Sequence, residues 1–376
     1  MGSDSVLSSH NTVFLRVDGN MANALEIVNK AIELGFDKCG MIPIEMMRGY
    51  ENRLEERMER FPQTKEKYES FRSFAHLQDD YPWAKEIVIL SFWYGKYRIP
   101  NGLQGRVAKY YLTDGRRNAD SQGYKTSVAF EKYLTDCGFR VATERDFGIT
   151  ALRWAGMQAG IGMIRKNNFF YTEKGSYQYL EAFLIDEPLQ YIAKSRLRPC
   201  PEQCNLCIRA CPTGSLEAPY MMCRNTCVSC LTTWDGWDLR AEPLQNKFGK
   251  WIYGCDACQD ACPYNKNAWK DTEEFPGLEE WGGHFTDEEI VLSDYDWLQS
   301  VVQPKLWYVP KGKEWRYKTN ALNAMLNNYD PKYLPVIEQA CHDEYFEVRD
   351  MAKWVLEEIQ KRDADETDNS CPSKKA

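Results

Sequence analysis

The stretches CPEQCNLCIRACPTG (residues 200–214) and YGCDACQDACPYN (residues 253–265) decide the organisation of this chain. Ten of its fourteen cysteines lie between residues 200 and 265. Both stretches end in Cys-x2-Cys-x3-Cys-Pro, the spacing with which a chain ligates paired iron–sulfur clusters, where the cysteine before proline binds the other cluster. The sequence therefore predicts two [4Fe–4S] clusters.

The exchange of the proline-flanked cysteines predicts two ligand sets. The first set is Cys200, Cys204, Cys207 and Cys262. The second set is Cys211, Cys227, Cys255 and Cys258. Cys227 comes from the intervening stretch MMCRNTCVSC (residues 221–230), in which Cys223 and Cys230 compete for the same position on spacing.

The cysteines allow three other interpretations: structural zinc, disulfides and a radical S-adenosylmethionine site. Structural zinc sites use Cys-x2-Cys pairs but do not need Cys-x3-Cys-Pro. Disulfides require an oxidising compartment, and the N-terminus carries no export signal pattern. The spacing Cys200-x3-Cys204-x2-Cys207 also occurs in radical S-adenosylmethionine enzymes, but these need no following Cys-Pro.

The composition is that of a globular protein outside the membrane. The chain has 376 residues, 43% hydrophobic and 27% charged, with a net charge of −8. No apolar run approaches the roughly 20 residues of a membrane span. We expect a cytoplasmic monomer, and the acidic balance argues against a broad basic surface for nucleic acid.

Patterns outside the cysteine region indicate an α+β protein of several parts. Alternating helices and strands predict an α/β domain over 22–195, followed by a double-cluster domain over 196–292. Helical periodicity over 293–362 is typical of a HEAT-like unit, and 363–376 reads as a disordered tail. From Ala24 we expect a helix that stops at Gly35 before a strand.

A glycine cluster marks the stretch AGIGMIRKNNFFYTEKGSY (residues 159–177). Gly160 and Gly162 permit either close packing of the chain on itself or close approach to a flat ligand. Both interpretations stay open on spacing alone. Lys166 and Asn167 follow the glycines, and Asp146 precedes them.

The arrangement resembles epoxyqueuosine reductases, the cobalamin-dependent iron–sulfur enzymes that act last in queuosine synthesis on tRNA. The resemblance covers about residues 22–362 and rests on CIRACPTGSLEAPY, CVSCLTTWD, YGCDACQDACPYNK and NALNAMLNN. It implies a nitroreductase-like cobalamin domain, a ferredoxin-like double-cluster domain and C-terminal HEAT-like helices.

The resemblance also implies cofactors, partners and site residues. The cofactors would be cobalamin and two [4Fe–4S] clusters, the substrate tRNA, and the electron source a ferredoxin or flavodoxin. Asp146 would protonate the departing epoxide oxygen. The corrinoid would lie against Tyr110, Gly160, Gly162, Lys166 and Asn167. None of the four histidines lies in an Asp-x-His-x-x-Gly sequence, so we do not expect a histidine of that pattern on the cobalt.

Several residues depart from the family pattern. No Asp-Tyr-His follows Tyr110, the family's Gly-Lys-Asn reads Arg165-Lys166-Asn167, and the first cysteine run opens with an extra residue between Cys200 and Cys204. These changes keep two alternatives open: a related corrinoid enzyme that reduces a small molecule, as reductive dehalogenases do, or an electron carrier with two clusters and no corrinoid.

Overall fold

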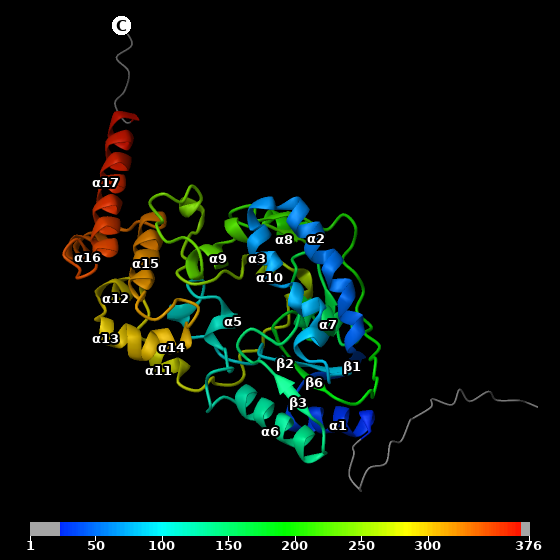
Figure 1. Ribbon diagram of the computed structural model, residues 1–376. Coiled ribbons are helices and arrows are strands. Elements are labelled where there is room, and N and C mark those ends of the chain that lie inside the picture. Colours follow the sequence, from blue (N-terminus) through cyan, green and yellow to red (C-terminus); the bar gives the residue numbers. More distant parts are fainter. Residues whose placement is uncertain (1–22, 370–376) are drawn as a thin grey trace, which may run out of the picture.

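A four-stranded antiparallel sheet forms the centre of the N-terminal half in the computed structural model, which describes residues 23–369 (Figure 1). The strand order is β1–β2–β6–β3, so the two long strands lie in the middle. The strands are β1 (Lys38–Pro43), β2 (Glu86–Trp93), β3 (Val141–Thr143) and β6 (Gln178–Ile185). Short hairpins add β4 (Met163–Ile164) with β5 (Phe170–Tyr171) and β7 (Leu216–Ala218) with β8 (Met221–Met222). The prediction of a mixed helix and sheet fold is confirmed.

Helices cover both faces of this sheet because successive side chains of a strand point to opposite faces. Val88 and Leu90 of β2 pack in one core with helices α1 (Ala24–Leu34) and α6 (Gln122–Asp136). Ile87 and Ile89 belong to a second core with α7 (Leu152–Gln158). Figure 1 shows α1 and α6 together on one side of the strands, and α7 lies on the other.

The predicted first helix and its stop signal are confirmed. Asn23 caps α1 through its side chain, and Glu26 completes a capping box by accepting from the backbone of Asn23. Gly35 ends the helix with φ of 114°, a conformation that glycine adopts without steric cost. The strand β1 follows directly.

The cysteine region consists mainly of loops that pack against the α/β part. Its helices are α8 (Leu206–Arg209), α9 (Val228–Thr233) and α10 (Ala257–Asp260). Tyr253 is fully buried, and its carbonyl accepts from the backbone N–H of Ala108 at 2.9 Å. One hydrophobic cluster includes Phe183 of the sheet, Tyr253 and Val355 of the last helix. The predicted domain boundaries are thus not marked by separate cores, and they stay a prediction.

The C-terminal helices lie against the cysteine region through polar side chains of α15. Arg316 is fully buried and donates to the carbonyls of Thr233 and Asp235 at the end of α9. Asn320 donates to the carbonyls of Thr232 and Ile252, both at 2.9 Å. The helices of this part are α11 (Leu278–Gly282), α12 (Asp287–Leu292), α13 (Tyr295–Trp297), α14 (Gln303–Lys305), α15 (Trp315–Asn327), α16 (Leu334–Ala340) and α17 (Phe346–Asn369).

The last helix corrects one prediction. The tail was expected to be disordered from residue 363, but α17 continues to Asn369, and residues 370–376 lie outside the described part. The remaining helices are α2 (Tyr50–Arg60), α3 (Lys65–Glu69), α4 (Leu77–Asp80) and α5 (Lys109–Leu112). None of the helices within residues 23–369 has both the length and the apolar character that a membrane crossing requires.

Candidate functional site: two thiol sets and an adjoining cavity

The first predicted ligand set comes together in the structure. Burial raises the pKa of the Cys207 thiol, and the nearby thiols of Cys262, Cys200 and Cys204 raise it further. Cys262 is more than fifty residues away in the sequence, yet it lies beside the first run, as the exchange of proline-flanked ligands predicts.

The second predicted set also comes together. Burial raises the pKa of Cys258 well above its usual range, and Cys255, Cys227 and Cys211 add to the shift. A hydrogen bond from Cys230 lowers the pKa of Cys227 to about 6, so these two thiols are immediate neighbours.

The structure narrows the choice of the intervening ligand. The sulfur of Cys223 accepts from Nε2 of Gln63 at 3.4 Å, and its backbone pairs with Ser215. Cys227, in contrast, lies near Cys255 and Cys258, the two thiols that Cys211 also approaches. Cys227 therefore lies beside the other thiols of the second set, with Cys230 next to it, and the choice of Cys227 as the ligand stays a prediction.

The two thiol sets match the ligands that two [4Fe–4S] clusters require. All thirteen cysteines in the described residues are free thiols. Within residues 23–369, no three His, Cys, Asp or Glu groups converge tightly enough to hold a single metal ion. Thiols that surround a four-iron cube lie farther apart than ligands of one ion, because each binds a different iron. Two groups of four thiols at the ends of short helices are the arrangement that paired clusters need.

Lys166 and Asn167 contact the cysteine loops. The ammonium of Lys166 donates to the carbonyls of Pro201, Glu202 and Cys204 at 2.8, 2.7 and 3.0 Å. Asn167 donates to the carbonyl of Cys258 at 3.2 Å. Each residue thus holds the loop of one thiol set, which the sequence did not predict. Their contact with a corrinoid stays a prediction.

The glycines of the same stretch serve packing of the chain on itself. Gly160 has φ of 68°, and a Cβ there would collide with the carbonyl oxygen of Ala193. A Cβ on Gly162 would collide with the carbonyl of Tyr171 and the ring of Phe170. The structure therefore accounts for both glycines without a ligand, which is one of the two interpretations left open by the sequence.

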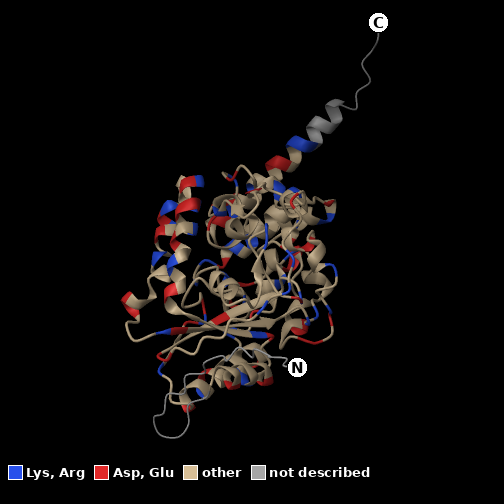
Figure 2. Cartoon of the chain, turned by 90° about the vertical axis from the view of Figure 1, so that its right-hand side faces the viewer, with Lys and Arg blue, Asp and Glu red and all other residues tan. Residues whose placement is uncertain are grey.

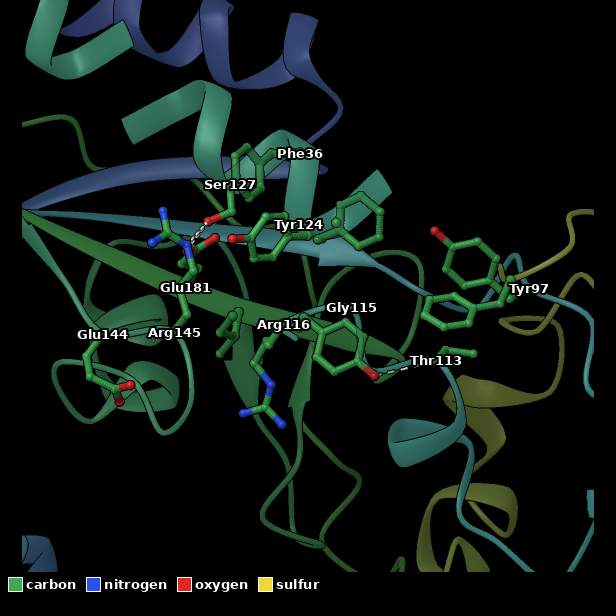
Figure 3. A pocket seen from close by; sticks show the side chains of 15 residues that line it. Phe36, Tyr97, Thr113, Gly115, Arg116, Tyr124, Ser127, Glu144, Arg145 and Glu181 are labelled. Atoms are coloured by element: carbon green, nitrogen blue, oxygen red, sulfur yellow. Dashed lines mark hydrogen bonds and ion pairs between the residues drawn. The ribbon is translucent and has the colours of Figure 1, made fainter. Parts of the chain in front are cut away.

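A cavity opens between β6, α6 and the loop 113–116 (Figure 3). The space between its wall residues is about 610 Å³ and is partly continuous with solvent. Aromatic rings dominate the wall: Phe36, Phe92, Tyr97, Tyr124, Tyr179 and Phe275. The wall also carries six polar or charged residues: Thr113, Arg116, Ser127, Glu144, Arg145 and Glu181. Aromatic surface with polar groups at fixed positions is typical of sites for organic ligands.

A buried acid lies at the base of this cavity. Burial raises the pKa of Glu181 to about 7, although Ser127 donates to its carboxylate. Figure 3 shows Arg145 beside the pair, with Nε donating to Oγ of Ser127 at 2.6 Å. The cavity therefore contains a carboxyl group that changes its charge near neutral pH.

Asp146 adjoins the rim of the cavity without being part of its wall: it follows the lining residues Glu144 and Arg145 in the sequence, and its backbone carbonyl accepts from the lining residue Arg116. Its carboxylate forms an ion pair with Arg117, with Nε of Arg117 donating to Oδ1 at 3.0 Å. Its side chain is 34% exposed. The bond from Arg117 lowers the pKa of Asp146. In this arrangement the predicted proton donor is an ionised, paired carboxylate.

Arg116 connects the Asp146 loop to the cavity wall. Its guanidinium donates to the backbone carbonyl of Asp146 and pairs with Asp114 at 2.7 Å. It also lies over the ring of Tyr110, 5.3 Å from the centroid. Tyr110 is packed among Tyr94, Tyr111 and Tyr179 rather than open to a ligand.

An aromatic ledge, defined by Phe147, Trp234, Trp307 and Tyr308, adjoins the Asp146 loop. Phe147 is 53% exposed and Trp234 is 39% exposed. Arg117 lies over Trp307, 3.8 Å from the ring centroid. Sequence reasoning missed the ledge and both arginines, although the pair Arg116-Arg117 was a visible signal.

Packed aromatic rings join the second thiol set to the cavity. Tyr111 hydrogen-bonds Ser229, between Cys227 and Cys230, at 2.9 Å. Its ring contacts Tyr110, and Tyr110 contacts Tyr179 of the cavity wall, with centroids 5.4 and 4.8 Å apart. No solvent layer separates these rings.

Known proteins share the cysteine region and much of the rest of this chain. Residues 200–265 match the family model of the 4Fe-4S double cluster binding domain. The epoxyqueuosine reductase of Prochlorococcus marinus (strain NATL2A) is 34% identical over 243 residues, which cover 63% of this chain and 69% of that protein.

Solved structures agree on the fold. A crystal structure of epoxyqueuosine reductase with an epoxyqueuosine-modified tRNA-Tyr stem loop has a TM-score of 0.68 at 22% identity, covering 89% of both chains. A Bacillus subtilis epoxyqueuosine reductase with its aspartate catalytic loop swung out of the active site has a TM-score of 0.69 at 21% identity, covering 89% of this chain and 90% of that one.

The thiol sets, the aromatic connection and the cavity define an iron–sulfur oxidoreductase with two [4Fe–4S] clusters beside a mixed helix and sheet domain. The chain belongs to the epoxyqueuosine reductase family.

Proposed function

We propose that this chain reduces epoxyqueuosine to queuosine in tRNA. The overall change takes two electrons and two protons, and it releases the epoxide oxygen as water while an alkene forms. The observation that carries the proposal is the continuous packing from the second thiol set through Tyr111 and Tyr110 to the cavity at whose rim Asp146 lies.

The aromatic ledge and Arg117 beside it have the features of a surface that binds an RNA loop. Unstacked bases bind on aromatic rings and on arginine planes, and arginine also pairs with phosphate. Phe147 and Trp234 offer exposed rings, and Arg117 lies directly beside them over Trp307. Figure 2 shows basic and acidic residues interspersed over the visible face, so a local contact is a better model than a broad basic surface.

The cavity fits a large organic cofactor in its chemistry, and we propose cobalamin there. Its aromatic rings suit an apolar ring system, but the space between the wall residues is narrow, so the 113–116 loop would have to move before a corrin enters. When bound, cobalamin supplies a strongly reducing cobalt centre that takes electrons singly from the clusters.

Asp146 has to change partners to act as an acid. A carboxylate paired with Arg117 holds no proton to give. When an anionic group such as an RNA phosphate takes over Arg117, the pKa of Asp146 returns upward and the protonated fraction grows. The residue then meets the requirement for a general acid at the departing oxygen.

The finer organisation is also proposed. The N-terminal part would be nitroreductase-like, the cluster part ferredoxin-like and the C-terminal helices HEAT-like, in a cytoplasmic monomer that receives single electrons from ferredoxin or flavodoxin. The eight cysteines of the two sets would be the cluster ligands.

The test uses full-length protein reconstituted without oxygen and a tRNA stem loop that carries epoxyqueuosine. Loss of the epoxide, scored by nucleoside mass, is the expected result. Asp146→Asn should abolish turnover while eight irons and the corrin absorbance remain. Asp120→Asn, an exposed aspartate in a nearby loop, is the matched control. Full cofactor loading with no epoxide loss would overturn the assigned substrate, and a fully active Asp146→Asn would overturn the assigned acid.

A further inference from the structure

Arg165 presents a buried cation with unused hydrogen-bond donors. Its side chain follows β4 and is only 1% exposed. Within residues 23–369 the Nε and Nη2 groups have no hydrogen-bond partner, and Nη1 donates only to the sulfur of Cys200, at 3.7 Å. The guanidinium stacks on Tyr264, 3.4 Å from the ring centroid.

The charge of Arg165 is not balanced by a carboxylate. Among residues 23–369 no aspartate or glutamate forms an ion pair with it, whereas Arg316, the other fully buried arginine of this part, donates to backbone carbonyls. An unpaired buried charge costs several kcal/mol, so such groups are normally paired. The missing anion must lie within reach of the guanidinium.

The first thiol set supplies that anion. Cys200 is in direct contact with Arg165, and Tyr264, which flanks the guanidinium, comes two residues after Cys262. A cluster held by four thiolates is negatively charged, and its sulfurs accept hydrogen bonds. The two unused N–H groups of Arg165 are therefore matched by acceptors that belong to the cluster.

The second thiol set has the opposite surroundings. Asp256 stands between Cys255 and Cys258 in the sequence and is 1% exposed. Lys109 pairs with it at 3.3 Å but shares its ammonium with Asp260 at 2.8 Å. Reduction makes a cluster more negative. The cation of Arg165 therefore favours reduction at the first set, and the two carboxylates that share Lys109 disfavour reduction at the second.

We propose that Arg165 is the counter-charge and hydrogen-bond donor of the cluster held by Cys200, Cys204, Cys207 and Cys262, and that it raises the reduction potential of this cluster above that of the other. The first electron from a one-electron donor then resides on this cluster. The second cluster, which adjoins the aromatic connection to the cavity, is reduced at lower potential. The inference rests on the clusters alone and is independent of the substrate.

The test is a potentiometric titration of anaerobically reconstituted full-length protein, followed by the electron paramagnetic resonance of the reduced clusters. Arg165→Met removes the charge and the donors, and Arg165→Lys keeps the charge. Arg209→Met is the matched control, because Arg209 is an exposed arginine at the end of α8, between Cys207 and Cys211, and forms no ion pair with any residue of the described part. Iron is counted in every sample.

Arg165→Met should lower the potential of one cluster by at least a tenfold change in its reduction equilibrium, which is about 59 mV for one electron. Arg165→Lys should recover part of this shift, and Arg209→Met should show none. Loss of four irons in Arg165→Met with their retention in Arg165→Lys would also support the counter-charge role. Unchanged potentials at full iron content, or equal iron loss in both variants, would overturn it.

Discussion

Lys166→Met should release one cluster faster while the fold is kept. Lys166 is 7% exposed as a residue, and its ammonium forms three hydrogen bonds to the loop between Cys200 and Cys204. Hydrogen bonds from a charged group contribute about 1.5–3 kcal/mol each. Pro201 and Glu202 are exposed, so water replaces part of what is lost. We therefore expect the loop to be destabilised by about 3 kcal/mol rather than by the full sum.

This destabilisation should increase the rate at which the protein releases iron. About 3 kcal/mol corresponds to roughly a hundredfold larger population of the open loop, since 1.4 kcal/mol is tenfold. Anaerobic transfer of iron to a chelator, followed by absorbance, should accelerate by that factor for four of the eight irons. The rate of iron transfer from Lys166→Arg should lie between the rates of the unaltered protein and Lys166→Met. Lys194 is an exposed lysine before the same loop, so Lys194→Met should release iron as the unaltered protein does.

An unchanged rate of iron release in Lys166→Met would refute the reasoning. If the same variant then failed to retain the corrinoid, Lys166 would act at the corrinoid, as the resemblance implies. The two measurements therefore decide between the observed contacts and the predicted ones.

Three further predictions concern the cavity and its walls. Arg117→Gln removes the cation that lowers the pKa of Asp146 in the free protein, so the loss of kcat/KM with rising pH, which reports the free protein, should move to higher pH; an unmoved profile would contradict the pairing. Glu181 has a folded-state pKa of about 7 against an ordinary 4.5, so its burial costs stability as pH rises from 4.5 through 7. The unfolding free energy of Glu181→Gln, taken relative to that of the unaltered protein, should therefore increase by up to about 3 kcal/mol between pH 4.5 and pH 8. Denaturant titration at both pH values measures this difference, and a difference that does not change with pH would contradict the assignment. Gly162→Ala should lose about 1–3 kcal/mol in the same titration, because its Cβ meets the carbonyl of Tyr171, and a neutral effect would favour a ligand-facing glycine.

Short-range signals in the sequence predicted much of the fold. The stop at Gly35 depends on one residue that adopts a positive φ, and the first helix depends on its own apolar spacing. The cysteine sets were predictable for the same reason, since ligand spacing in short loops fixes which thiols converge on one cluster. Even the distant partner Cys262 follows from its Cys-Pro pair.

Contacts between distant segments could not be predicted in this way. Lys166 and Asn167 follow the glycines, so the sequence placed them at a ligand, whereas they bind carbonyls some 35 and 90 residues away. The ion pair between Arg117 and Asp146 joins two loops of the chain that carry no common pattern. A local pattern reports periodicity and turn chemistry, but it does not report which backbone carbonyl a lysine will reach.

Two departures from the family pattern that lie far apart in the sequence meet at one point of the structure. The family's glycine before Lys-Asn is Arg165 here, and the first cysteine run carries an extra residue after Cys200. Nη1 of Arg165 lies 3.7 Å from the sulfur of Cys200, so the added cation and the altered ligand loop adjoin the same cluster. A guanidinium cannot enter a buried site without both space and an anion, and a longer loop with a thiolate at its start supplies both. The two changes are therefore best understood as one change in the electrostatics of the first cluster, separate from the missing Asp-Tyr-His after Tyr110.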